Sequence, residues 1–229
     1  MANQLDLEEQ EQLDQIKHFW NQYGNLITWL LLGVLASVAA WNGYHYWQRS
    51  QAAQSAAMFD EMGKSLAGGD LAKAQRTFAD MQERYAGSTY THQAGLALAK
   101  MAADAANPDA AKAALQWVAD KTGDEGYAAI ARLRLANVYL DTNAYPEAIK
   151  TLNGVKNEAF SALVADRLGD VFVLQGKKAE AKEAYLRAYK KLPADVPYQR
   201  LLLVKLNALG VDPQMDAGLE NKAGSKGKP

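Results

Sequence analysis

The stretch ALVADRLGDVFVLQGKKAEAKEAYLRAYKKLP, residues 162–193, decides the fold because it has the pattern of two short helices that cross closely. Its first half carries a large-small pair, Leu168 and Gly169. Its second half carries a small residue, Ala181, four positions before an aromatic one, Tyr185. Two antiparallel helices approach closely only where one of them has Gly or Ala at the crossing. The stretch therefore predicts a helical hairpin in which Gly169 meets Ala181.

The same pattern recurs three times upstream, at successive intervals of thirty-three, thirty-seven and thirty-seven residues. The recurring positions are Leu135, Ala136, Tyr139, Ala148 and Leu152, then Leu98, Ala99, Ala111 and Leu115, and finally Ala74 and Phe78. This spacing of large, small and aromatic residues is the tetratricopeptide pattern. Because one helical pair cannot bury its apolar face alone, the pairs are expected to stack into a solenoid.

We therefore predict an all-α, tetratricopeptide-like α-solenoid of about four helical pairs. A C-terminal capping helix, VPYQRLLLVKLNALG at residues 196–210, is expected to follow it. The repeat domain is predicted at 49–210, and its first pair is incomplete because the leading helix, about 49–66, continues from an apolar segment upstream. From 211 to 229 the chain is rich in Gly, Lys and Pro, which predicts a disordered tail.

The apolar segment upstream is LITWLLLGVLASVAAWNGYHYWQR, residues 26–49. No formally charged residue occurs from His18 to Gln48, and a helix needs about 20 residues to cross a hydrocarbon core of about 30 Å. Aromatic residues, which favour the headgroup region, gather at both ends: Trp20, Tyr23, Trp29, Trp41, Tyr44, Tyr46 and Trp47. The segment predicts a single transmembrane helix at 22–48, preceded by a short acidic segment at 1–21.

Two other interpretations of this segment are weaker. The small residues Ser37–Ala39 suit a signal cleavage site, but a cleaved signal needs a positive n-region, and the first seventeen residues are acidic. A buried core helix has no reason to carry aromatic residues at both ends. The charges leave the orientation open, because Lys17 on one flank balances Arg49 on the other.

One face of the predicted span carries only small residues: Gly33, Ala36, Ser37, Ala40 and Gly43. Small residues let a second helix approach closely, and such packing drives helix association in lipid. The alternative is that this face has no partner, since Gly and Ala are common in membrane helices. The face is our candidate contact for a partner helix, from another membrane protein or from a second copy in a homodimer.

In a stack of this kind the first helix of each pair lines a concave face. By helical spacing that face contains Gln93, Leu96, Lys100, Ile130, Leu133, Asn137, Leu163, Asp166 and Asp170. The mixture is apolar and mildly polar, without a row of Lys or Arg to clamp a carboxyl terminus. It indicates an adaptable groove for extended or partly folded polypeptides. The alternative is that the leucines simply pack between repeats.

Composition and motifs argue against other classes of function. A formal net charge of −1 argues against nucleic-acid binding, and the lack of cysteine excludes disulfides and thiolate metal sites. The three histidines are scattered, and neither a phosphate loop nor a nucleophile elbow occurs. Asp166 and Asp170 are four residues apart, but such like charges are expected on a solvated or peptide-facing surface. We predict no catalytic residue, no metal site and no cofactor.

Segments along most of the chain resemble the YfgM-like ancillary subunits of the bacterial Sec translocon. They are QIKHFWNQYGN, the span ending WNGYHYW, ARLRLA at 131–136 and ALVADRLGD at 162–170. The resemblance covers about Glu8 to Asn207. It implies a cytoplasmic N-terminus, a periplasmic repeat domain, and association with the SecYEG channel and with periplasmic chaperones. It brings no catalytic residues.

Together these observations predict a non-enzymatic, single-pass protein of the cell inner membrane. Its repeat domain would engage the translocon channel, periplasmic chaperones or emerging polypeptides. The alternative function is a membrane-tethered scaffold for another cell-envelope complex, unrelated to translocation.

Overall fold

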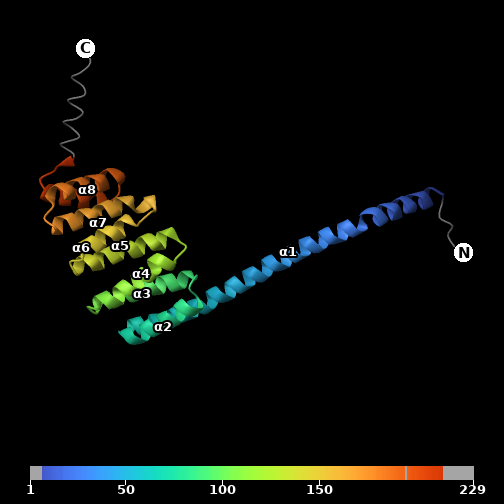
Figure 1. Ribbon diagram of the computed structural model, residues 1–229, viewed down its shortest axis with the longest axis horizontal. Coiled ribbons are helices and arrows are strands. Elements are labelled where there is room, and N and C mark those ends of the chain that lie inside the picture. Colours follow the sequence, from blue (N-terminus) through green and yellow to red (C-terminus); the bar gives the residue numbers. More distant parts are fainter. Residues whose placement is uncertain (1–6, 194, 214–229) are drawn as a thin grey trace, which may run out of the picture. The chain divides into compact units, whose positions relative to one another are not determined.

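The computed structural model describes residues 7–193 and 195–213. These residues form nine α-helices and one 3-10 turn, with no strand among them. The elements are α1 Leu7–Ala67, α2 Leu71–Arg84, α3 Thr89–Asp104, α4 Pro108–Lys121, α5 Glu125–Asp141, α6 Tyr145–Asn153, η1 Glu158–Phe160, α7 Ser161–Leu174, α8 Lys178–Lys191 and α9 Tyr198–Ala208. The predicted all-helical repeat fold is confirmed (Figure 1). Most of the predicted tail, 214–229, lies outside the described residues.

The chain divides into two compact units, Met1–Ala53 and Gln54–Pro229. In the first unit, α1 is long and apolar enough to cross a membrane by length and composition, and its large apolar side chains are exposed. Two polar side chains within the predicted span bond to the backbone of the same helix: Ser37 donates to the Gly33 carbonyl at 2.7 Å, and Asn42 donates to the Val38 carbonyl at 2.9 Å. Such internal pairing is what a bilayer, which offers no water, requires.

In the second unit the helices stack in chain order, as Figure 1 shows for α2 to α8. The C-terminal part of α1, residues 54–67, forms the first pair with α2, since Met62, Ala74 and Phe78 belong to one buried cluster. Three further pairs follow, α3 with α4, α5 with α6, and α7 with α8. The single helix α9 packs on α8 and completes the stack.

A left-handed residue ends the first helix of every pair, and also ends α9. These residues are Gly69 (φ 71°), Ala106 (53°), Asn143 (58°), Gly176 (74°) and Gly210 (77°). In each case the next residue donates its N–H to the carbonyl five positions back, for example Lys177 to Phe172 at 2.8 Å. This is the Schellman motif, which satisfies carbonyls that a helix end leaves unpaired. The five turns give the repeats a common register.

The crossing of α7 and α8 is as close as the large-small pattern predicts, but its nearest partner differs. A Cβ added to Gly169 would lie 2.3 Å from Cε1 of Tyr185, which is one turn beyond Ala181. The same role falls to Gly95 on α3, where an added Cβ would lie 2.5 Å from Cγ2 of Val118. Glycine is therefore needed at both positions for close approach rather than for backbone freedom.

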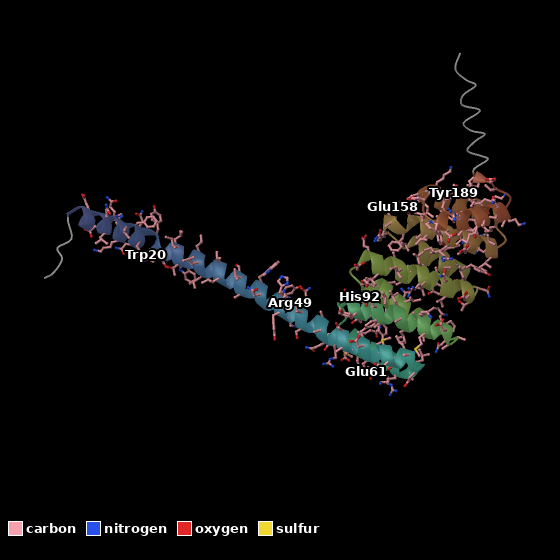
Figure 2. The ribbon with its side chains drawn as sticks, turned by 180° about the vertical axis from the view of Figure 1, so that it is seen from behind. Trp20, Arg49, Glu61, His92, Glu158 and Tyr189 are labelled. Atoms are coloured by element: carbon pink, nitrogen blue, oxygen red, sulfur yellow. The ribbon has the colours of Figure 1, made fainter. Side chains whose placement is uncertain are left out.

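His92, which is labelled in Figure 2, bonds to the turn before α3 and to the turn after α4. His92 is 5% exposed, and its Nε2 lies 3.1 Å from the Ala86 carbonyl, an acceptor, so this nitrogen carries the proton. Nδ1 then accepts from the Thr122 hydroxyl at 3.2 Å. Burial lowers the pKa of His92, against the smaller opposing effects of the Ala86 hydrogen bond and the Asp124 charge. The imidazole is thus held neutral.

Because the folded-state pKa of His92 is lowered, the repeat domain is expected to lose stability as pH falls through about 6.5, the ordinary histidine pKa. Below that pH the unfolded chain binds the proton and the folded chain resists it. His92→Gln keeps an N–H near Ala86 and cannot titrate. We expect the melting temperature of the full chain to fall by about 2–4 °C more between pH 7.5 and 5.5 than that of His92→Gln. His18→Gln, on the exposed part of α1, should keep the wild-type dependence, and equal pH slopes in all three proteins would contradict the assignment.

Candidate functional site

Among the first helices of the pairs, α5 contacts both α3 and α7, so the three helices follow one another along the stack. Each of these helices is followed by a left-handed residue, Ala106, Asn143 or Gly176. When positions are numbered backwards from that residue, the nine predicted groove residues fall into three rows. The row at −13 holds Gln93, Ile130 and Leu163, the row at −10 holds Leu96, Leu133 and Asp166, and the row at −6 holds Lys100, Asn137 and Asp170. The prediction thus selected equivalent positions in three successive repeats.

A hollow of about 220 Å³ between α5 and α7 gathers four of these nine residues, Ile130, Leu133, Asn137 and Leu163. Phe160 from η1 completes its apolar lining. Two arginines, which the sequence analysis did not place in the groove, also line it. They are Arg134 on α5 and Arg167 on α7. The hollow is therefore an apolar surface with guanidinium groups on both helices that form it.

The two arginines occupy equivalent positions in the repeat pattern. Arg134 and Arg167 both lie nine positions before a left-handed turn residue, in consecutive repeats. Arg134 is exposed and donates one bond to the Leu96 carbonyl at 3.4 Å. Arg167 is 35% exposed at its side chain and pairs with Asp170 at 2.9 Å. The sequence predicted a groove without a row of Lys or Arg, whereas Arg134 and Arg167 occupy equivalent positions in its α5–α7 part.

The three predicted residues on α3 lie outside this hollow. Leu96 is 8% exposed and belongs to the main hydrophobic core. The side-chain amide of Gln93 donates to the Tyr127 hydroxyl at 2.8 Å. Lys100 forms an exposed pair with Asp104 at 2.6 Å. Leu96 thus packs between repeats, which was the alternative interpretation for this position.

Asp166 and Asp170 are covered by α9 and do not form a solvated surface. Asp166 is 0% exposed, accepts from the Tyr198 hydroxyl at 2.7 Å and pairs with Lys205 at 2.6 Å. Lys205 also pairs with Asp170 at 2.7 Å, and Tyr185 donates its hydroxyl to the same Asp170 oxygen at 2.7 Å. The expectation of a solvated surface is wrong. Helical spacing gives the face of α7 on which the two aspartates lie, but it does not show that α9 covers that face.

The tyrosines of this network act as hydrogen-bond donors over the whole physiological pH range. Burial, together with the bond to Asp166, raises the pKa of Tyr198 to about 12. Burial and the bond to Asp170 also raise the pKa of Tyr185 well above its ordinary value. The carboxylates of Asp166 and Asp170 thus accept hydrogen bonds from Lys205, from Arg167 and from the two tyrosine hydroxyls. This arrangement fixes α9 on α7 and leaves no free acid–base pair.

In the first unit, the small-residue face of α1 is open. Gly33, Ala36, Ser37, Ala40 and Gly43 are all exposed, and a Cβ added to Gly33 or Gly43 would meet no atom within 4 Å. Nothing in the described part of the chain covers this face. Likewise, no group of three or more His, Cys, Asp or Glu in the described ranges is placed to hold a metal ion.

These features define a helical-repeat protein with one apolar helix of membrane-spanning length. The sequence matches the tetratricopeptide repeat-like domain family over residues 17–211. It is 30% identical over 207 residues to the ancillary SecYEG translocon subunit of Neisseria gonorrhoeae, covering 89% of this chain and 98% of that protein. The protein of the same name from Haemophilus influenzae is 30% identical over 209 residues, covering 89% and 98%. The chain therefore belongs to the family of ancillary SecYEG translocon subunits.

Among solved structures, the crystal structure of MamA aligns with a TM-score of 0.45 at 19% identity, over 69% of this chain and 96% of that one.

Proposed function

We propose that this protein is a single-pass inner-membrane subunit that associates with the SecYEG channel through its apolar helix. Its N-terminus lies in the cytoplasm and its repeat domain in the periplasm, where the domain contacts chaperones or emerging polypeptides. The observation that carries the proposal is the 30% identity over nearly the full length of relatives named as ancillary translocon subunits. The exposed apolar helix supports it physically, since a surface of that length needs lipid or protein around it.

The arrangement of the repeat domain suits an adaptor better than an enzyme. The hollow between α5 and α7 offers apolar side chains and two arginines, a mixture that holds a chain without reacting with it. The buried aspartates are matched by Lys205 and Arg167, so neither is available as a general acid or base. Anchoring beside the channel would raise the effective concentration of the domain near emerging chains, so weak binding suffices.

The small-residue face supplies the contact with the channel. It offers close approach at Ala36 and Ala40, whereas the opposite face, with Val34 and Val38, carries larger side chains toward lipid. Larger side chains on the small-residue face should separate α1 from the channel helix by several ångströms and remove the packing between them. Adding the same bulk to the opposite face should change little.

The test is purification of the full chain from membranes in mild detergent, with mass spectrometry of the co-purified proteins. We expect Ala36→Leu/Ala40→Leu to lower recovery of the channel subunits about fivefold, which corresponds to about 1 kcal/mol of helix packing. Val34→Leu/Val38→Leu is the matched control and should leave recovery unchanged.

Unchanged recovery with Ala36→Leu/Ala40→Leu would remove the small-residue face from the proposal. Capture of a different envelope complex, without channel subunits, would favour the scaffold function instead.

A further inference from the structure

We propose that the side of the repeat domain formed by α5, α7 and α9 binds an extended polypeptide segment in which apolar side chains flank an acidic one. This inference rests on the proposed function, in which the domain meets emerging chains, and it specifies the chemistry of the bound segment. Two observations carry it, an apolar surface that continues onto α9 and a guanidinium group without a carboxylate partner.

The lining rows continue from α7 onto α9. Lys205 and Tyr198 bond to Asp166, so the two helices are neighbours. In the common register Leu201 is equivalent to Arg134 and Arg167, and Val204 is equivalent to Asn137 and Asp170. The hollow between α5 and α7 is therefore followed by an apolar strip on the next helix.

The two apolar side chains of this strip, Leu201 and Val204, are much more exposed than the apolar side chains that pack between repeats. Val204 is 64% exposed and Leu201 45%, although large apolar side chains elsewhere in the repeat domain are mostly covered. The last helix of a solenoid is expected to carry a polar outer surface that keeps the stack soluble. Exposed apolar side chains in neighbouring positions mark a surface that binds a partner.

The charges of the surface select an acidic group in the bound segment. Arg167 pairs with Asp170, and Lys205 holds both Asp166 and Asp170. Arg134 forms no ion pair within the described residues, and it donates a hydrogen bond to the Leu96 carbonyl. A guanidinium group in this position binds a carboxylate through two parallel hydrogen bonds. The acidic side chain should lie over Arg134, with apolar neighbours in the hollow and on the α9 strip.

The protein's own tail matches the surface less well than a foreign segment, because its charge is mixed. Residues 214–229 carry Asp216 and Glu220, but Lys222, Lys226 and Lys228 follow them, and these lysines would come close to Arg134 and Arg167. We therefore assign the surface to a foreign chain, and deletion of residues 214–229 tests the tail as the occupant.

The experiment uses the full chain in lipid nanodiscs and two fluorescein-labelled twelve-residue peptides of alternating leucine and serine. One peptide has a central glutamate and the other a central lysine. Fluorescence anisotropy should show the glutamate peptide binding about tenfold more tightly, the effect of one charge-assisted contact of about 1.4 kcal/mol. The difference should shrink as salt rises from about 50 to 500 mM, because the contact is exposed and screened.

Variants locate the site. Arg134→Gln should abolish the preference for glutamate, while Leu201→Gln/Val204→Gln should weaken both peptides about equally. All three positions are exposed, so the variants should melt like the wild type. Arg187→Gln on α8 is the matched control, since Arg187 is also exposed and pairs only at 3.9 Å with Glu183; it should bind like the wild type.

Equal binding of the two peptides, or an unchanged preference in Arg134→Gln, would overturn the inference. So would binding that appears only after residues 214–229 are deleted, because the surface would then belong to the tail. The two proposals fail separately: absence of peptide binding with the channel still co-purified defeats only this inference, and peptide binding without channel recovery defeats only the proposed function.

Discussion

Lys205→Met is expected to free α9 from the stack and to destabilise the C-terminal end of the repeat domain by about 3 kcal/mol. Methionine keeps the aliphatic stem but removes the charge that pairs with Asp166 at 2.6 Å and Asp170 at 2.7 Å. Asp166 is 0% exposed, so it would remain as a buried charge that accepts a hydrogen bond from the Tyr198 hydroxyl but has lost its lysine. Breaking a buried pair from one side costs about 3–5 kcal/mol, and the nearby Arg167 places this case at the lower end.

The loss should be local, because each repeat contacts only its neighbours. Amide hydrogen exchange of the full chain, followed by mass spectrometry, should therefore accelerate in α7, α8 and α9 and stay unchanged in α3 and α4. The matched control is Lys100→Met, which removes an ion pair of similar length but with side chains 73% and 65% exposed. That change should cost less than about 1 kcal/mol.

A second variant tests whether the buried charge is the cause. Adding Asp166→Asn to Lys205→Met replaces the unmatched carboxylate with an amide that still accepts from Tyr198. We expect exchange in α9 to slow again, part of the way to the wild-type rate. Exchange at the wild-type rate in Lys205→Met itself would show that apolar packing alone holds α9.

The fold was accessible from the sequence because its determinants are local and repeated. Gly169 with Ala181, and Ala136 with Ala148, mark helix crossings at the same spacing of twelve residues. The apolar segment between Trp29 and Trp41 carries aromatic residues at both ends, as a core helix does not. The turns strengthen the repeat further, since a left-handed residue ends the first helix of each pair. Ala106 and Asn143 occupy that position without glycine, so the turn was visible only in the backbone.

The candidate site was accessible only in part, for a physical reason. Helical spacing gives the face on which a side chain lies, but not the neighbouring helix that covers that face. Ile130 and Leu163, predicted on the same face, line one hollow together, whereas Asp166 is covered by α9, whose Lys205 lies thirty-nine residues later in the chain. Binding at the hollow stays a prediction.

The largest packing effect in the repeat domain is expected from Gly169→Ala. The new Cβ would lie 2.3 Å from Cε1 and 2.4 Å from Cδ1 of Tyr185, far inside van der Waals contact. The ring cannot swing away, because Tyr185 is 3% exposed and its hydroxyl is bonded to Asp170 at 2.7 Å. Either α7 and α8 must separate or the Tyr185–Asp170 bond must break. Overpacking of this kind costs about 1–3 kcal/mol, and loss of the bond to a charged acceptor adds about 1.5–3 kcal/mol.

Helix propensity favours alanine over glycine and therefore opposes the destabilisation expected for Gly169→Ala. A glycine at which only this propensity acts provides the control. Alanine is preferred over glycine inside a helix by about 1 kcal/mol, so Gly169→Ala should still destabilise the domain by about 2 kcal/mol or more. Gly63→Ala lies in α1 where an added Cβ meets no atom within 4 Å, and there only the propensity remains. Urea denaturation of the full chain, followed by circular dichroism, should shift to lower urea for Gly169→Ala and to higher urea for Gly63→Ala. Shifts of the same sign would mean that the α7–α8 crossing can open at little cost and that Gly169 does not set its distance.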